Sequence, residues 1–391
     1  MGITASMTIA TGAGVVSSAL TTLSTKVSAK LASSLLRYRS QRACQEIFKK
    51  MFSIRLVKTF ISLDKPIDIE SFYVPLKLSF GKNSKIVSDI NEIPGPCSVI
   101  SGIAGQGKSM MLRMLCVNEM KRGLRIPLFI ELRKCKADDP LAGDIERALK
   151  AYGLDFHKPL IDELMSIGAI SLYLDGFDEV ETDSRAKLLQ AIEELISRHP
   201  KVKIIISSRP ESGIEGSPFG VFTFCELEHG DHATIINKIL EPEHAKDMLE
   251  AIAQKRELLD DLLCTPLMVT LLVITYRSYH KIPDQIGAFY EDLFTMLLDR
   301  HDGLKRGYVR RRKVILNNGD FRRVFEALCM STKGSALMSY KLSDWHQKAK
   351  FALRACGHCS TDEEKFTSDI IAITCLIIRD GIEYRFIHKS I

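Results

Sequence analysis

The sequence has few of the features that mark secreted or membrane proteins. Its ten cysteines are scattered along 391 residues without a disulfide-type framework, which favours free thiols in a reducing compartment. Residues 2–25 carry no charge, yet Ser, Thr, Gly and Ala dominate them, so their apolar density is too low for a signal peptide or a spanning helix. The net charge of +6 is small and does not by itself demand a nucleic acid or a membrane. We therefore expect a cytoplasmic chain of two or three domains.

A basic segment follows the uncharged start. Between residues 26 and 58 nine lysines and arginines face a single acidic residue, Glu46, and apolar residues recur at roughly helical spacing. This pattern predicts a basic, helical N-terminal arm over residues 1–64 that acts as an effector or assembly element. The arm could pack on its own domain or on a sister chain, or contact a membrane surface or nucleic acid. Prolines and glycines then interrupt residues 65–96, which we interpret as a linker and domain entry.

The sequence GIAGQGKS at 102–109 fits the pattern G-x-x-x-x-G-K-[ST]. A short apolar strand (97–101) precedes it and a helix with Met, Leu and Val at helical spacing follows it. Strand, glycine-rich loop and helix N-terminus together form a phosphate cradle, with Lys108 between the β- and γ-phosphates and Ser109 as a ligand of Mg²⁺. The predicted nucleotide-binding residues are Gly102, Ile103, Ala104, Gly105, Gln106, Gly107, Lys108, Ser109 and Met110.

Apolar strands alternate with helices over residues 97–228, which predicts a parallel sheet covered on both faces. The strands are expected at 97–101, 125–132, 169–174, 202–206 and 221–226. One strand is inserted between the strand before the phosphate loop and the acidic strand. This is the order of additional-strand P-loop ATPases.

An acidic motif follows the third of these strands. Asp175 stands at its carboxyl end, where it would hold Mg²⁺, and Asp178 or Glu179 could orient the attacking water. Asp178 could instead cap the next helix. Arg209 follows the fourth strand and is predicted to sense the γ-phosphate, or else to form a surface salt bridge. Because no N-K-x-D motif follows the acidic strand, adenine is favoured over guanine.

Residues 229–317 read as a helical domain, and residues 318–391 alternate short helices and strands as a winged-helix module does.

Together these motifs resemble the NACHT branch of the STAND ATPases, an AAA+-like group of P-loop signalling switches. The matching pieces are GIAGQGKS, LYLDGFDE at 172–179 and IIISSRP at 204–210, and the segment 289–312 is most similar to bacterial anti-phage members. CTPLM at 264–268 resembles the family's proline motif, which implies that Pro266 lines the adenine pocket. FIHKS at 386–390 resembles its winged-helix motif, which implies that His388 contacts the β-phosphate of ADP. The resemblance also implies a partial, truncated winged helix and a missing C-terminal sensor region.

The resemblance implies a slow, Mg²⁺-dependent ATPase that works as a switch. ADP would hold a closed monomer, and sensing of an unknown ligand would favour exchange for ATP and homo-oligomerisation, in innate immunity or anti-phage defence. Two alternatives are an AAA+-type motor that remodels a substrate, and a nucleic-acid-binding winged-helix ATPase, whose DNA binding would fall steeply with salt.

Overall fold

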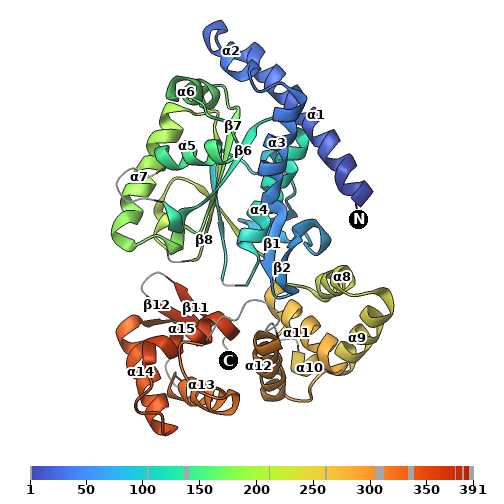
Figure 1. The fold of residues 1–391 in the computed structure, drawn as a ribbon, viewed down its shortest axis with the longest axis vertical. Helices are drawn as coiled ribbons and strands as arrows, with labels where there is room; N and C mark the ends of the chain where they lie inside the picture. Colours follow the sequence, from blue (N-terminus) through green and yellow to red (C-terminus); the bar gives the residue numbers. More distant parts are fainter. Residues whose placement is uncertain are drawn as a thin grey trace. The chain divides into compact units, whose positions relative to one another are not determined.

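The computed structural model describes residues 2–103, 105–135, 141–210, 212–259, 262–303, 312–332, 339–374, 376–380 and 383–386. It consists of two compact units, Met1–Glu226 and Leu227–Ile391, which are described separately (Figure 1). Every cysteine among the described residues is a free thiol, as the sequence predicts.

A seven-stranded sheet forms the centre of the first unit. Its order is β4-β3-β9-β5-β8-β7-β6. The five strands β9, β5, β8, β7 and β6 are parallel, and their β-branched and apolar side chains are almost all buried, as expected for a sheet covered on both faces. These strands are β5 (Cys97–Ser101), β6 (Ile126–Glu131), β7 (Ile170–Asp175), β8 (Lys203–Ser208) and β9 (Gly220–Phe224). Because β8 lies between β5 and β7, the additional-strand order is confirmed.

Four helices accompany these strands, namely α4 (Lys108–Arg122), α5 (Ala142–Ala151), α6 (Lys158–Ser166) and α7 (Thr182–Arg198). α4 packs on β6, β7 and β8 through buried Met111, Leu112, Leu115 and Cys116. Figure 1 shows α4 and α7 on opposite sides of the sheet. This arrangement brings the carboxyl ends of β5, β7 and β8 to one edge, where the loops that follow them meet.

The prediction of a linker at residues 65–96 is wrong. This stretch contains most of β2 (Ser62–Asp68), which pairs with β1 (Leu56–Thr59), and the hairpin of β3 (Lys77–Phe80) and β4 (Asn83–Ile86). β3 runs antiparallel to β9, so the sheet is mixed rather than wholly parallel. The glycines and prolines mark turns between short strands, as at Gly81 with φ of +60°. Two 3₁₀ turns, η2 (Ile69–Ser71) and η3 (Ile90–Glu92), complete the segment.

The N-terminal arm is mainly helical as predicted as far as residue 55, whereas β1 and the start of β2 occupy the rest of residues 1–64. The helical part packs within the first unit. It comprises α1 (Gly2–Lys26), α2 (Ala29–Leu36), α3 (Gln41–Phe52) and the 3₁₀ turn η1 (Ser53–Arg55). α1 contacts α2, α3 and α4, and α3 buries Cys44, Ile47, Phe48, Met51 and Phe52 along one face. Across the described residues no helix combines the length and the apolar character that a membrane span requires.

The second unit begins with a group of helices. These are α8 (His229–Ile239), α9 (Pro242–Gln254), α10 (Arg256–Leu259), α11 (Pro266–Tyr279) and α12 (Ile286–Gly303). α11 contacts both α8 and α12, and six of its consecutive residues, Leu271–Tyr276, are buried, so it is the central helix of the group.

The rest of the second unit has the winged-helix arrangement. Its elements are α13 (Asn318–Thr332), β10 (Ser339–Lys341), α14 (Leu342–Ala355), α15 (Glu363–Thr374), β11 (Ile377–Asp380) and β12 (Glu383–Phe386), with an antiparallel sheet of order β10-β12-β11. Trp345 is fully buried among aromatic rings, and its indole N–H donates to Thr367 Oγ1 at 3.2 Å. The described residues of this part contain three helices and three strands.

Candidate functional site

The phosphate loop joins β5 to α4. Gly107, the N-cap of α4, has φ of +90° and Gly105 has φ of +82°, which only glycine adopts without strain. At Gly102 the need is space, because a Cβ there would lie 2.5 Å from Gln106 Oε1 and 2.9 Å from a Phe224 ring carbon. Gln106 in turn accepts the Ile103 N–H at 2.8 Å. The predicted Ala104 lies outside the described residues.

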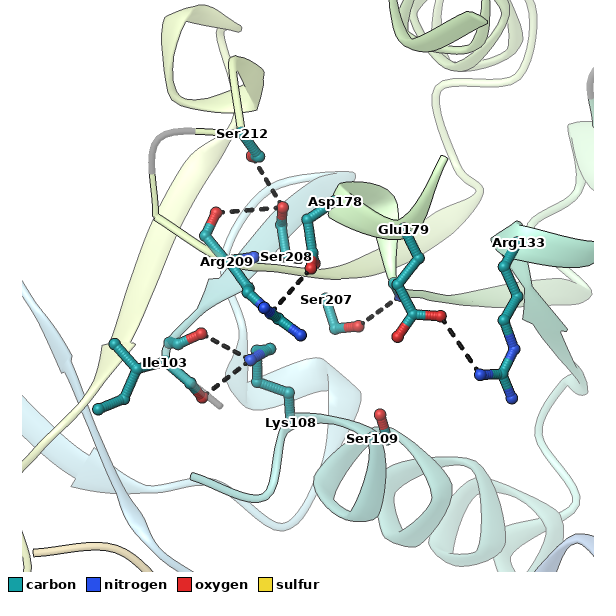
Figure 2. Close-up of polar contacts among 12 residues, drawn as sticks. Ile103, Lys108, Ser109, Arg133, Asp178, Glu179, Ser207, Ser208, Arg209 and Ser212 are labelled. Carbon is teal, nitrogen blue, oxygen red and sulfur yellow. Dashed lines mark hydrogen bonds and ion pairs between the residues drawn. The ribbon is translucent and has the colours of Figure 1, made fainter. Parts of the chain in front are cut away.

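Lys108 is the first residue of α4, and its side chain lies back over the loop. Its ammonium donates to the carbonyl oxygens of Gly102 at 2.6 Å and Ile103 at 3.0 Å (Figure 2). These bonds hold the Lys108 ammonium against the phosphate loop. The same ammonium would meet the phosphate oxygens of a nucleotide bound there.

Ser109 and Asp175 come together although they lie on different elements. Ser109 Oγ donates to Asp175 Oδ1 at 2.9 Å. A hydroxyl and a carboxylate oxygen beside a phosphate loop are ligands that Mg²⁺ accepts, so the two residues predicted to hold the metal fit it. Sequence reasoning missed Ser207, at the penultimate position of β8. Its Oγ donates to the same Asp175 oxygen at 2.6 Å and accepts the Gly176 N–H at 2.8 Å, which fixes the carboxylate.

The two adjacent carboxylates at the end of the acidic motif have different surroundings. Asp178 is buried, and both its oxygens bind Arg209: Oδ1 accepts the main-chain N–H and Oδ2 pairs with Nε, each at 3.0 Å. Both side chains are at most 12% exposed, so this is no surface salt bridge. The helix cap proposed for Asp178 is not formed either, since Glu181 is the N-cap of α7.

Glu179 is 36% exposed at its side chain and stands apart from that pair. Burial raises the pKa of Glu179 above its ordinary value, and the charges of Asp178 and Asp175 add to the rise, while Arg133 and Arg209 oppose it. A carboxylate with a raised pKa that faces the phosphate side is suited to accept a proton from water. Of the two candidates, Glu179 therefore has the better position for a general base.

Arg185 of α7, a second residue absent from the sequence prediction, holds this region together. Its guanidinium donates to the carbonyl oxygens of Asp178, of Val180 at 2.9 Å and of Ser212 at 3.5 Å. It therefore links the loop after β7 to the loop after β8. In the sequence Arg185 is one of several charged residues of an amphipathic helix, so nothing there indicates this role.

The remaining predicted residues lie elsewhere. Met110 follows Ser109 on α4 and is partly buried. Pro266 is the first residue of α11 in the second unit, after the N-cap Thr265, whose Oγ1 accepts the Met268 N–H at 3.3 Å. His388 lies outside the described residues. Their contacts with a nucleotide stay predictions.

The segment that carries this site matches a known protein family. Residues 97–218 match the model of the NACHT domain, from the first residue of β5 to just before β9. Comparison with curated proteins gives no match.

Several solved structures are similar to the chain. A Walker-type ATPase of Pyrococcus abyssi is 14% identical over 76% of this chain and 89% of its own, with a TM-score of 0.37. Cdc6p of Pyrobaculum aerophilum is 14% identical over 75% of this chain and 84% of its own, with a TM-score of 0.33. A STAND protein with a tetratricopeptide repeat sensor from Pyrococcus horikoshii is 14% identical over 75% of this chain and 38% of its own, with a TM-score of 0.31.

Proposed function

We propose that this chain, which carries a NACHT domain over residues 97–218, is a nucleotide-operated signalling switch of the STAND type. It binds ATP or ADP with Mg²⁺, hydrolyses ATP slowly, and assembles with further copies of itself when a ligand is sensed. We place it in the cytoplasm, in innate immunity or anti-phage defence.

The observation that carries the proposal is the pair formed by Ser109 and Asp175 beside Lys108. Their oxygens lie 2.9 Å apart at the start of α4, where the two residues would hold a metal ion beside the nucleotide phosphates. Lys108 supplies the charge for the phosphates, and the α4 N-terminus supplies main-chain N–H groups. This arrangement supports a triphosphate with Mg²⁺ as the ligand.

The chain's own residues then divide the work of hydrolysis. Glu179 orients and deprotonates the attacking water, and Arg209, held by Asp178, senses the γ-phosphate. Mg²⁺, when bound, neutralises charge on the phosphates. Hydrolysis returns the switch to its ADP state, in which Pro266 and His388 retain the nucleotide.

We propose that the N-terminal arm carries the output of the switch. The arm, α1 to α3, packs on the nucleotide-binding part of the first unit, which supports a role that depends on the nucleotide state. We assign it to assembly or effector output, with a possible contact to a membrane or nucleic acid. We assign the sensing of the unknown ligand to a C-terminal sensor region.

A nucleic-acid-binding role finds less support. In a winged helix that binds DNA, the N-terminal residues of the second helix of the helix-turn-helix contact base edges. In this chain that helix, α15, begins with Glu363 and Glu364. Two carboxylates at this position would be repelled by DNA phosphates.

The experiment measures the assembly state against the bound nucleotide. Mass photometry of the purified protein should show monomers with ADP and larger assemblies with a non-hydrolysable ATP analogue. Lys108→Ala should stay monomeric in both. Assemblies that are independent of the nucleotide would contradict the switch, and rapid continuous turnover without a change of assembly state would favour the motor.

A further inference from the structure

Glu179 is paired with a residue from the neighbouring strand. Arg133 lies in the 3₁₀ turn η4 (Leu132–Lys134), directly after β6, and its Nη1 is 3.5 Å from Glu179 Oε2 (Figure 2). β6 is the edge strand beside β7, and their register pairs Glu131 with Asp175. Arg133 therefore stands beside the loop that carries Glu179.

The pair fixes the orientation of the Glu179 carboxylate. In Figure 2 one oxygen faces Arg133, and the other faces the space above Ser109, where the phosphates would lie. Both side chains are partly exposed, 56% for Arg133 and 36% for Glu179, so the pair contributes little to stability. Its consequence is positional, because Arg133 determines which oxygen is directed at the phosphate side.

Arg133 is itself held by a second carboxylate. Its Nη2 lies 3.5 Å from Glu131 Oε1, which Arg113 approaches to 3.4 Å from α4, and Lys134 pairs with the other Glu131 oxygen. Although burial alone would raise the pKa of Glu131, the Lys134 hydrogen bond and the charges of Arg133, Lys134 and Arg113 lower it. Glu131 is thus a stable anion shared by three cations.

Arg113 continues this chain to the N-terminal arm. Its guanidinium lies 4.4 Å from the centre of the Phe129 ring and donates to the carbonyl oxygen of Ile54 at 3.3 Å. Ile54 belongs to η1, which directly follows α3. The contacts border a cavity of about 460 Å³ that Lys50, Ser53, Ile54 and Arg113 line together with β6 and α5.

We propose that Arg133 is a positioning residue for Glu179 and that Glu131 and Arg113 tie its position to the N-terminal arm at Ile54. This inference rests on the proposed function, since it concerns the residue that orients the attacking water. When η1 is displaced, Arg113 moves with it and releases Glu131. Glu131 then attracts Arg133 away from Glu179, and the Glu179 carboxylate turns from the phosphate side. The arm thereby regulates hydrolysis without contacting the nucleotide.

The first test compares charge-matched variants in single-turnover ATP hydrolysis by the full-length protein. Arg133→Ala should lower the rate about tenfold and leave the ATP dissociation constant unchanged, as expected when only transition-state positioning is lost. Arg133→Lys should restore most of the rate. Lys187→Ala removes an exposed positive charge of α7 that lies outside this chain of contacts and should behave as wild type. An unchanged rate in Arg133→Ala, or an equal loss in Lys187→Ala, would overturn the inference.

The second test is a double-mutant cycle between Arg113 and Arg133. If one chain of contacts links the arm to Glu179, Arg113→Ala lowers the rate about threefold in the wild type and has no effect in the Arg133→Ala background. Equal effects in both backgrounds, or no effect in either, would contradict the link. If the wild type does not hydrolyse ATP, or if Glu179→Gln hydrolyses ATP as fast as the wild type, the proposed function itself is refuted.

Discussion

Asp178 binds Arg209 with both carboxylate oxygens, one on the main-chain N–H and one on Nε, each at 3.0 Å. The pair joins the end of the acidic motif to the end of β8. Of the two adjacent carboxylates at the end of the motif, it leaves that of Glu179 partly exposed near the phosphate side.

Removal of Asp178 should therefore cost stability as well as activity. Because the pair is buried, Asp178→Ala should lower the free energy of unfolding by about 3 kcal/mol, the range for breaking a buried ion pair. Urea denaturation measures this. Asp178→Asn, which keeps an acceptor for the Arg209 N–H, should lose less. Equal stability of Asp178→Ala and wild type would show that the pair is not formed in solution.

Glu179 sets the acid limb of the pH profile of hydrolysis. It accepts a proton only when ionised, and burial raises its pKa, so the single-turnover rate should fall with decreasing pH at a value above the ordinary glutamate pKa. Because Arg133 opposes the rise, Arg133→Ala should move this limb to higher pH. Glu179→Gln should lower the rate about 10²–10⁴-fold and remove the limb. An acid limb that stays in Glu179→Gln would belong to another group.

Ser207 should control the dependence on Mg²⁺. Because its hydroxyl fixes the Asp175 carboxylate at 2.6 Å, Ser207→Ala should require about tenfold more Mg²⁺ for half-maximal hydrolysis, in the range for residues that orient metal ligands. Ser208→Ala is the matched control, since the neighbouring Ser208 hydroxyl bonds to Ser212 and to the Arg209 carbonyl instead. A magnesium titration in which the two variants coincide would remove Ser207 from the site.

Two glycines of α1 test the packing of the arm. A Cβ at Gly12 would lie 2.2 Å from the Phe48 ring, whereas nothing lies within 4 Å of a Cβ at Gly14. Gly12→Ala should therefore destabilise the first unit by about 1–3 kcal/mol. Gly14→Ala should stabilise it by about 0.5–1 kcal/mol through helix propensity. The same small effect at both positions in thermal unfolding would mean that α1 does not pack on α3.

The sequence could predict those parts of the site that follow from one strand and its own loop. Asp175 ends β7 and Arg209 directly follows β8, while Lys108 and Ser109 begin the helix after the loop that follows β5. Because the carboxyl ends of parallel strands lie at one edge of a sheet, the convergence of these residues follows from the strand pattern alone. The pairing of Glu179 with Arg133 depends instead on β6 lying beside β7 in a particular register. Neighbours across a sheet cannot be read from a single chain without its strand order.

The β3–β4 hairpin and the packing of α1 could not be predicted, because neither leaves a clear periodic pattern in the sequence. The β3–β4 hairpin is only four residues per strand, too short for a clear alternation, and the turn at Gly81 looks like a linker break. The contact of Gly12 with Phe48 depends on the absence of a side chain, which leaves no periodic pattern. The sequence therefore predicts an arm that could pack on its own domain, but it does not predict which residues make the contact.

The nucleotide content of the purified protein tests the central claim most directly. After denaturation, chromatography of the released small molecules should give ADP in near-equal amount to the wild-type chain. Lys108→Ala should release none, because the loop N–H groups alone cannot balance the phosphate charge. Calorimetry of the emptied wild type should show ATP and ADP binding that Lys108→Ala lacks. A wild type without nucleotide and without affinity for one, or a Lys108→Ala variant that binds as tightly, would contradict the account.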